Sequence, residues 1–192
     1  MLFRSDWAGG LLGAGTPEER EALAVSSETG SAGLRFLPFL SGIGSPDYDS
    51  RTGGAFVGLG LSHGRPEVML SVYEGVLLES RRVLEAVAPA ARIERLVLGG
   101  GPSSGSMTGL IAEVLGRPFH LAPSSEASLL GAAAVAWRGA GLFSGVADAG
   151  RELAGTGLVE VEPEDPERYD AVYREYRSMV TGIRRMRDGV EG

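Results

Sequence analysis

The residues best suited to chemistry form a glycine-rich turn near the middle of the chain. Gly99, Gly100 and Gly101 lie between a short apolar run and the start of a helix pattern. Glycine lets a backbone approach a ligand closely, and a helix start offers unpaired N–H donors at the positive end of the helix dipole. The turn therefore predicts a nucleotide site or, if glycine serves only backbone geometry here, a tight strand-to-helix connection.

The same turn also matches the nucleophile elbow of α/β-hydrolases. Residues 101–105, Gly-Pro-Ser-Ser-Gly, fit the G-x-S-x-G pattern between a strand and a helix. That mechanism needs an acid and then a histidine after the serine, yet only His120 follows Ser103, and the one acid between them is Glu113 in mid-helix. We therefore expect Ser103 not to act as a nucleophile.

The remaining polar candidates are more typical of structural roles. His63 and His120 have no His or Cys at metal-ligand spacing, which favours a structural role for each. Asp47 and Asp49 could bind a sugar hydroxyl or a cation, although such residues more often form turns. The acidic run over residues 160–165 indicates a solvated loop.

The amino-acid composition excludes several mechanisms. All 18 basic residues are Arg, and the chain has no Lys, Asn, Gln or Cys. A P-loop NTPase needs a phosphate-binding Lys, and a protein kinase needs a strand Lys and a catalytic-loop Asn, so neither site can be built. Without Cys the chain has no disulfide or cysteine nucleophile, which suits a reducing compartment.

Length and charge favour one globular domain. The chain has 192 residues, of which 43% are hydrophobic and 22% charged. No segment approaches the roughly 18 apolar residues of a membrane helix, and residues 1–15 lack a secretory pattern, so we expect a cytoplasmic protein without a membrane partner. The net charge of −7 repels phosphate backbones, so we expect no nucleic-acid partner, although backbone N–H groups could still hold a small nucleotide.

Periodicity and turn residues predict the elements that must hold the glycine turn. A long amphipathic helix with one buried face is expected over 66–88, Gly116 should end the helix after the turn, and Pro38 argues against a central strand over 34–40. Further helices are expected over 7–12, 17–25, 107–115, 126–137, 145–153 and 168–187, and strands over 55–61, 93–98, 117–121 and 157–161. This alternation implies an α/β sheet with covering helices.

Three motifs then resemble the FGGY family of carbohydrate kinases, most strongly from residue 33 onward. The first is the loop over 36–49, whose Gly-Ile-Gly-Ser-Pro at 42–46 is nearer to the glycerol kinase version than to the xylulokinase one. The second is the strand over 54–59 with Tyr-Glu-Gly-Val at 73–76 and Val-Leu-Glu at 83–85. The third is the glycine turn with Ser104, followed by Glu126 and by Leu-Gly-Ala-Ala at 130–133.

The resemblance implies a fold and a function for the whole chain. Residues 1–192 would form a single C-terminal nucleotide-binding domain of the α/β class, ribonuclease H-like as in actin-like ATPases, with a mixed sheet flanked by helices and without its first strands. It would be the ATP-binding half of an enzyme that transfers the γ-phosphoryl group of ATP to a sugar or polyol hydroxyl. ATP or ADP would be its partner, and the sugar or polyol would bind only together with the missing N-terminal domain.

The resemblance also implies individual roles. Gly100 and Gly101, in the turn that begins at Gly99, would lie against the phosphate and ribose region of the nucleotide, Ser104 would face the adenine, and the helix from Glu126 would close the pocket. The catalytic Asp, the phosphate-binding hairpin and the magnesium ligand are expected in the absent N-terminal part, so we assign no catalytic residue and no metal ligand to this chain.

Three departures from the family pattern bear on substrate specificity and activity. Met107-Thr108 stands where family members often carry Trp-Arg, and Gly53 and Ser71 each stand where Arg is common. The chain resembles a fragment, so we expect it to be inactive alone, because phosphoryl transfer needs both halves of the cleft. We also expect a homo-oligomer, because a sheet edge without its neighbours recruits another chain. The alternative is a non-catalytic nucleotide-binding or interaction domain.

Overall fold

The computed structural model describes residues 2–90, 92–99, 105–122, 124, 126–154 and 157–190. Its helices are α1 (Leu2–Leu12), α2 (Pro17–Val25), α3 (Arg65–Val87), α4 (Gly105–Leu115), α5 (Ala127–Gly139), α6 (Val146–Ala154) and α7 (Asp170–Val190), with a 3-10 turn, η1, at Ser31–Gly33. Its strands are β1 (Arg35–Leu37), β2 (Ala55–Val57), β3 (Val97–Leu98), β4 (Phe119–Leu121) and β5 (Val159–Val161). Over these ranges, no helix is long and apolar enough to cross a membrane.

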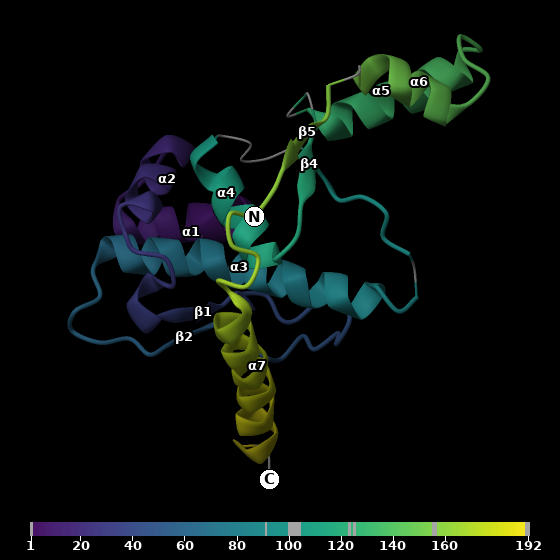
Figure 1. Ribbon diagram of the computed structural model, residues 1–192. Coiled ribbons are helices and arrows are strands. Elements are labelled where there is room, and N and C mark those ends of the chain that lie inside the picture. The colour runs from purple at the N-terminus through teal and green to yellow at the C-terminus, as the bar shows by residue number, and fades with distance from the viewer. Residues whose placement is uncertain are drawn as a thin grey trace.

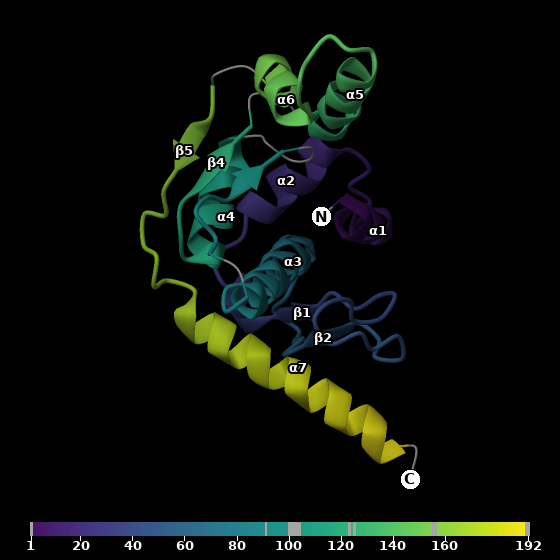
Figure 2. The same cartoon turned by 90° about the vertical axis from the view of Figure 1, so that its right-hand side faces the viewer.

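The long helix α3 lies at the centre of the described structure, between the α1, α2 and α4 helices and the layer formed by β1, β2 and α7 (Figures 1 and 2). Pro66 in its first turn and Glu67, whose carboxylate accepts a hydrogen bond from the Gly64 N–H at 2.7 Å, fix its N-terminus. Its middle, from Met69 to Leu78, is buried at all positions but one. The expected single buried face is therefore wrong for this stretch, because neighbours pack on more than one side of the helix.

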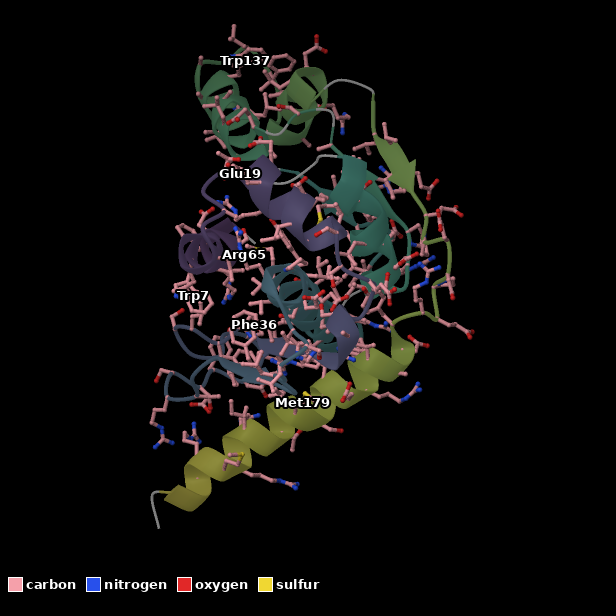
Figure 3. The ribbon with its side chains drawn as sticks, turned by 90° about the vertical axis from the view of Figure 1, so that its left-hand side faces the viewer. Trp7, Glu19, Phe36, Arg65, Trp137 and Met179 are labelled. Carbon is pink, nitrogen blue, oxygen red and sulfur yellow. The ribbon has the colours of Figure 1, made fainter. Side chains whose placement is uncertain are left out.

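Two apolar clusters pack against α3. One joins α3 and β1 to α4, β4 and the tyrosine-rich face of α7, and the other joins α3 and β1 to α1, α2 and the first turn of α4. In the second cluster Trp7 of α1 stacks on Phe36 of β1, with ring centroids 6.0 Å apart (Figure 3), and Phe36 in turn contacts Phe56 at 4.7 Å. The strand β1 is thus buried along its whole length and contributes to both clusters.

The hairpin of β1 and β2 lies directly against α3. The strands are antiparallel, with Phe36 opposite Phe56. A Cβ atom built on Gly75 of α3 would lie 2.2 Å from the carbonyl oxygen of Phe36, which no side chain could tolerate. Glycine at this position therefore lets the helix backbone contact the strand backbone.

A second, mixed sheet has the strand order β3-β4-β5. β3 and β4 are parallel, whereas β4 and β5 are antiparallel, with His120 opposite both Val97 and Glu160. Among the described strands β3 has no neighbour on its other side, so it forms an edge. The predicted α/β organisation, with a mixed sheet and covering helices, is therefore confirmed.

Most predicted elements occur, with shifted ends. The helix expected over 17–25 is present as α2, with a capping box at Thr16, and the expected helix end at Gly116, which has a φ of +63°, is confirmed. The strand expected over 93–98 is reduced to Val97–Leu98, because its partner β4 is itself only three residues long. The strand expected over 55–61 ends at Val57, where Gly58 with a φ of +84° turns the chain.

Helices α5 and α6 pack mainly on each other and project away from the α3-centred body (Figure 1). Trp137 of α5 stacks on Phe143 of the loop between the two helices, with ring centroids 5.6 Å apart. Large apolar side chains of the two helices and this loop remain exposed, at Leu129, Val135, Leu142 and Val146. The pair therefore forms a separate arm at the end of the mixed sheet.

The close contact between α3 and β1 leads to a stability prediction. Gly75→Ala should destabilise the fold by about 1–3 kcal/mol, because the added methyl group overlaps the Phe36 carbonyl and forces the helix from the strand. Gly182→Ala is the matched control, since a methyl group at Gly182 of α7 would have nothing within 4 Å, and it should stabilise the protein by roughly 0.5–1 kcal/mol. Urea unfolding of both variants measures the difference. A Gly75→Ala protein as stable as Gly182→Ala would contradict the contact.

Candidate functional site

Two strand ends and one helix start meet at one edge of the mixed sheet. Because β3 and β4 are parallel, their carboxyl ends point to the same edge, where Gly99 and Ala122 follow them. A Cβ atom built on Gly99 would lie 2.9 Å from the Cβ of Ala127, the first residue of α5, and 3.3 Å from that of Ala122. Open α/β sheets bind ligands in the crevice beyond the carboxyl ends of their strands, which makes this edge the candidate site.

The start of α5 supplies hydrogen-bond donors to this edge. Its first helical bond runs from the Leu130 N–H to the Glu126 carbonyl at 3.0 Å, so the N–H groups of residues 127–129 have no carbonyl partner within the helix. The Glu126 N–H donates to the Ser124 hydroxyl at 3.1 Å, and the Glu126 side chain is exposed and does not cap the helix. N–H donors without an intrahelical partner at a helix N-terminus favour an anionic group such as a phosphate.

The predicted site residues are only partly placed by the structure. Gly99 and Glu126 lie at the two sides of the junction between β3 and α5. Gly100, Gly101 and Ser104 lie outside the described residues, so their predicted roles at the phosphate, ribose and adenine stay predictions. The helix after the turn begins at Gly105, two residues earlier than expected.

The hydrolase alternative gains no support from its described members. Ser103 lies outside the described residues. Glu113, the one acid in the required interval, is only 7% exposed and accepts a hydrogen bond from Arg168 at 2.6 Å, which joins α4 to the segment before α7. Its carboxylate therefore serves a structural ion pair. Nδ1 of His120 is buried without a hydrogen-bond partner among the described atoms, so no described acid orients that ring.

His63 has the structural role that its isolation in the sequence predicted. Its Nδ1 accepts a hydrogen bond from the Gly60 N–H at 2.8 Å, which leaves Nε2 to donate to the Ala32 carbonyl at 3.2 Å. The ring thus fixes the loop before α3 against η1.

Asp47 and Asp49 bind arginines of the helices. Asp47 pairs with Arg82 of α3 and with Arg184 of α7, and Asp49 accepts a hydrogen bond from Arg187 of α7. The hydrogen bond from the Thr52 hydroxyl, together with this guanidinium, lowers the pKa of Asp49 to about 2. Within the described part of the chain, no group of three or more His, Cys, Asp or Glu residues could hold a metal ion.

A buried carboxylate within the 73–76 motif, Glu74, connects α3 to two distant segments, although the sequence analysis assigned it no role. Glu74 of α3 is 1% exposed and accepts hydrogen bonds from the Gly30 N–H at 2.7 Å, the Ser31 hydroxyl at 2.7 Å and the Tyr169 hydroxyl at 2.6 Å. Burial raises the pKa of Glu74. The hydrogen-bond partners of Glu74 lie far away in sequence. The one local signal of its role is that a charged residue stands within an apolar helix pattern.

Comparisons with known proteins agree with this architecture. The model for the C-terminal domain of the FGGY family of carbohydrate kinases matches residues 9–140. The chain belongs to the FGGY family of carbohydrate kinases. A glycerol kinase from Gloeobacter violaceus is 31% identical over 180 residues, covering 91% of this chain and 35% of that protein. One from Alcanivorax borkumensis is 32% identical over 168 residues, covering 82% and 34%. The chain thus spans about a third of the length of these curated relatives.

Solved FGGY kinases share the fold. The xylulose kinase of Rhodospirillum rubrum matches with a TM-score of 0.74 and 27% identity, over 96% of this chain and 38% of that chain. The Plasmodium falciparum glycerol kinase with ADP matches with a TM-score of 0.74 over 94% of this chain and 37% of that one, and its 15% identity shows likeness of fold alone. The predicted actin-like, ribonuclease H-like class is therefore confirmed, as a partial domain of these kinases.

The residues that depart from the family pattern differ in how deeply they are buried. Met107 is fully buried in the apolar cluster of α1, α2 and α3, so it serves packing. Ser71 is 1% exposed, and its hydroxyl donates to the Val68 carbonyl at 2.8 Å within α3. Gly53 lies exposed in the loop before β2, where an added Cβ atom would have nothing within 4 Å. An arginine could therefore be accommodated at Gly53 but not at Ser71 in this packing.

The junction of β3 and α5 leads to a second prediction. Gly99→Ala should destabilise the fold by about 1 kcal/mol or more, because its methyl group would lie 2.9 Å from that of Ala127. Ala127→Gly in the same chain should restore part of that loss, which a double-mutant cycle in urea measures as a coupling energy. Gly131→Ala within α5, where nothing lies within 4 Å, is the control and should be neutral or stabilising. Additive effects at Gly99 and Ala127 would show that the two residues do not touch.

Proposed function

We propose that this chain is the ATP-binding half of a carbohydrate kinase that transfers the γ-phosphoryl group of ATP to a sugar or polyol hydroxyl. The observation that carries the proposal is the meeting of Gly99 with Ala127, which brings the turn after β3 to the exposed N-terminus of α5. In this proposal Gly99, Gly100 and Gly101 lie along the phosphates and ribose, Ser104 faces the adenine, and α5 from Glu126 closes the site.

Backbone groups rather than cationic side chains would hold the nucleotide. The chain has no lysine and a net charge of −7, so attraction of a phosphate must be local. The N–H groups at the start of α5, which have no partner within the helix, and the positive end of its dipole supply that attraction without a charged side chain. A binding site of this kind holds ATP or ADP but does not by itself activate a hydroxyl.

The transfer reaction needs groups that we do not assign to this chain. The substrate oxygen forms a bond to the γ-phosphorus as the bond from that phosphorus to the β,γ-bridging oxygen breaks, ADP leaves, and a base takes the hydroxyl proton. We place that base, the magnesium ligand and most of the sugar site in the N-terminal domain of the kinase. The isolated chain would then bind nucleotide and remain inactive.

The relatives support the substrate class but not one substrate. The curated relatives above are glycerol kinases, whereas the Rhodospirillum rubrum neighbour is a xylulose kinase. The Plasmodium falciparum neighbour is a glycerol kinase whose structure contains ADP. Glycerol and xylulose are both polyhydroxylated, so a sugar or polyol hydroxyl is the acceptor that we propose.

We also propose that the isolated chain self-associates through the edge of β3. Val97 on this strand is 54% exposed, and no described strand pairs with its free side. An unpaired edge offers N–H and C=O groups to a second chain. Light scattering at increasing concentration tests this proposal, and a monomer at every concentration would contradict it.

A calorimetric titration tests nucleotide binding. The purified chain should bind ADP weakly, and Gly100→Arg should abolish binding, because the long side chain would occupy the approach to the turn. Gly139→Arg is the matched control, since it introduces the same residue at the opposite end of α5, where the backbone is open, and should leave ADP affinity unchanged. Equal ADP affinity in the wild-type and Gly100→Arg proteins would remove the turn from the site.

A coupled assay tests the inactivity of the chain alone. The purified chain with ATP and glycerol or xylulose should form no sugar phosphate, because a missing general base alone costs roughly 100- to 10,000-fold in rate. A full-length glycerol kinase in the same assay shows that the conditions support transfer. Mass spectrometry measures the sugar phosphate. A yield that increases with the amount of this chain would contradict the assignment of the general base to the N-terminal domain.

A further inference from the structure

A pocket that is separate from the junction of β3 and α5 lies between α3, α7 and the loop before β2. Its volume is about 360 Å³, which is at the lower end of the range for small-molecule sites. Its polar lining comes from Asp47, Arg82, Glu85, Arg177, Thr181 and Arg184. None of these residues belongs to the proposed nucleotide site.

The wall that α7 contributes is locally basic. Arg177, Thr181 and Arg184 follow one another at helical spacing, so they share one face of α7, and all three line the pocket. The helix carries five arginines and three acidic residues in a chain whose net charge is −7. Figure 2 shows this helix running below β1, β2 and α3, so its basic face and the end of α3 can act on one ligand.

Two of the arginines retain unused hydrogen-bond donors. The guanidinium of Arg177 lies 3.7 Å from the Glu85 carboxylate, beyond hydrogen-bond distance, and its side chain is 61% exposed. Among the described residues, the guanidinium of Arg184 donates a hydrogen bond to Asp47 at 3.0 Å, and its Nε lies 3.9 Å from the Asp49 carboxylate. A guanidinium has five N–H donors in a planar fork, so most of the donors on both residues remain available. Arg82, by contrast, uses all three of its nitrogens in hydrogen bonds to Glu79 and Asp47.

The acidic residues of the pocket are already compensated by neighbours. Asp47 pairs with both Arg82 and Arg184. Glu85 accepts a hydrogen bond from the Tyr173 hydroxyl at 2.8 Å and lies 3.8 Å from Arg81. The lining itself has three cations and two anions, and because Glu79 also pairs with Arg82, the donors left for a ligand are those of Arg177 and Arg184.

We propose that this pocket binds a small molecule that carries a phosphate group. The forks of Arg177 and Arg184 match the oxygens of a phosphate, which accepts two such bidentate pairs more readily than a single carboxylate does. Val180 and Ala86 provide an apolar surface for a short carbon chain beside it. A phosphate held by these two arginines of α7 would bind only the folded protein, so occupancy should raise the Tm.

Thermal unfolding with defined ligands tests the proposal. Inorganic phosphate and glycerol 3-phosphate should each raise the Tm of the full chain, whereas glycerol and sodium chloride at matched ionic strength should not. The Gly100→Arg variant should give the same shifts, which separates this pocket from the nucleotide site, so failure of one proposal leaves the other testable. A larger shift with glycerol 3-phosphate than with phosphate supports a phosphomonoester as the ligand, and equal shifts support free phosphate.

Variants on one helix decide whether the arginine fork is responsible. Arg177→Gln should abolish the shift, and Arg177→Lys should weaken it several-fold, because lysine keeps the charge but loses the fork. Arg174→Gln is the control, since Arg174 is exposed on the same helix and does not line the pocket. Circular dichroism shows whether each variant folds. The proposal is overturned if neither phosphate compound shifts the wild-type Tm at millimolar concentration, or if Arg177→Gln responds like Arg174→Gln.

Discussion

The buried carboxylate of Glu74 is the interaction on which the rest of the structure depends. It accepts hydrogen bonds from Gly30 and Ser31, at the start of η1, and from Tyr169 just before α7. Segments that are distant in sequence are thus tied to the middle of α3. A buried carboxylate is costly unless its hydrogen bonds are made, and its loss would leave three donors facing a buried space. The arrangement is therefore all or none: either every partner is present or the core around α3 is destabilised.

The residue that follows Glu74 imposes a second constraint at the same place. Gly75 lets α3 approach β1 so closely that any side chain would overlap the Phe36 carbonyl. That approach brings the η1 turn, which leads into β1, within reach of the carboxylate. Ser31 has a left-handed φ of +50°, an uncommon conformation for serine, and its hydroxyl is held by Glu74. Packing at Gly75 and hydrogen bonding at Glu74 therefore support each other. Together they explain why a Glu-Gly pair stands in the middle of α3.

Local signals in the sequence predicted most helices and strands. The features that they did not predict depend on contacts between residues that are distant in the sequence. The start of α2 at Pro17 and the end of α4 at Gly116 depend on neighbouring residues, so both could be predicted from the sequence. The shortening of β3 depends on the length of β4, and the burial of α3 on several faces depends on distant helices. At the candidate site, Gly99 was predictable from its type, but its contact with Ala127 was not. Asp47 is a similar case, because a loop aspartate does not reveal an arginine partner 137 residues later.

The two ends of the molecule differ in how firmly they are held, and this difference bears on function. The α3-centred body is fixed by two apolar clusters and by the bonds to Glu74. The arm of α5 and α6, which carries the N-terminal donors of the proposed nucleotide site, packs mainly on itself and leaves Leu129 and Val135 exposed. The proposed site lies between a sheet edge and a helix with few contacts to the rest of the chain, so its geometry depends on any further contact that the helix makes. If the proposed nucleotide binds there, the free energy of ordering the arm is taken from the binding energy. The weak nucleotide binding that we propose for this chain is consistent with that cost.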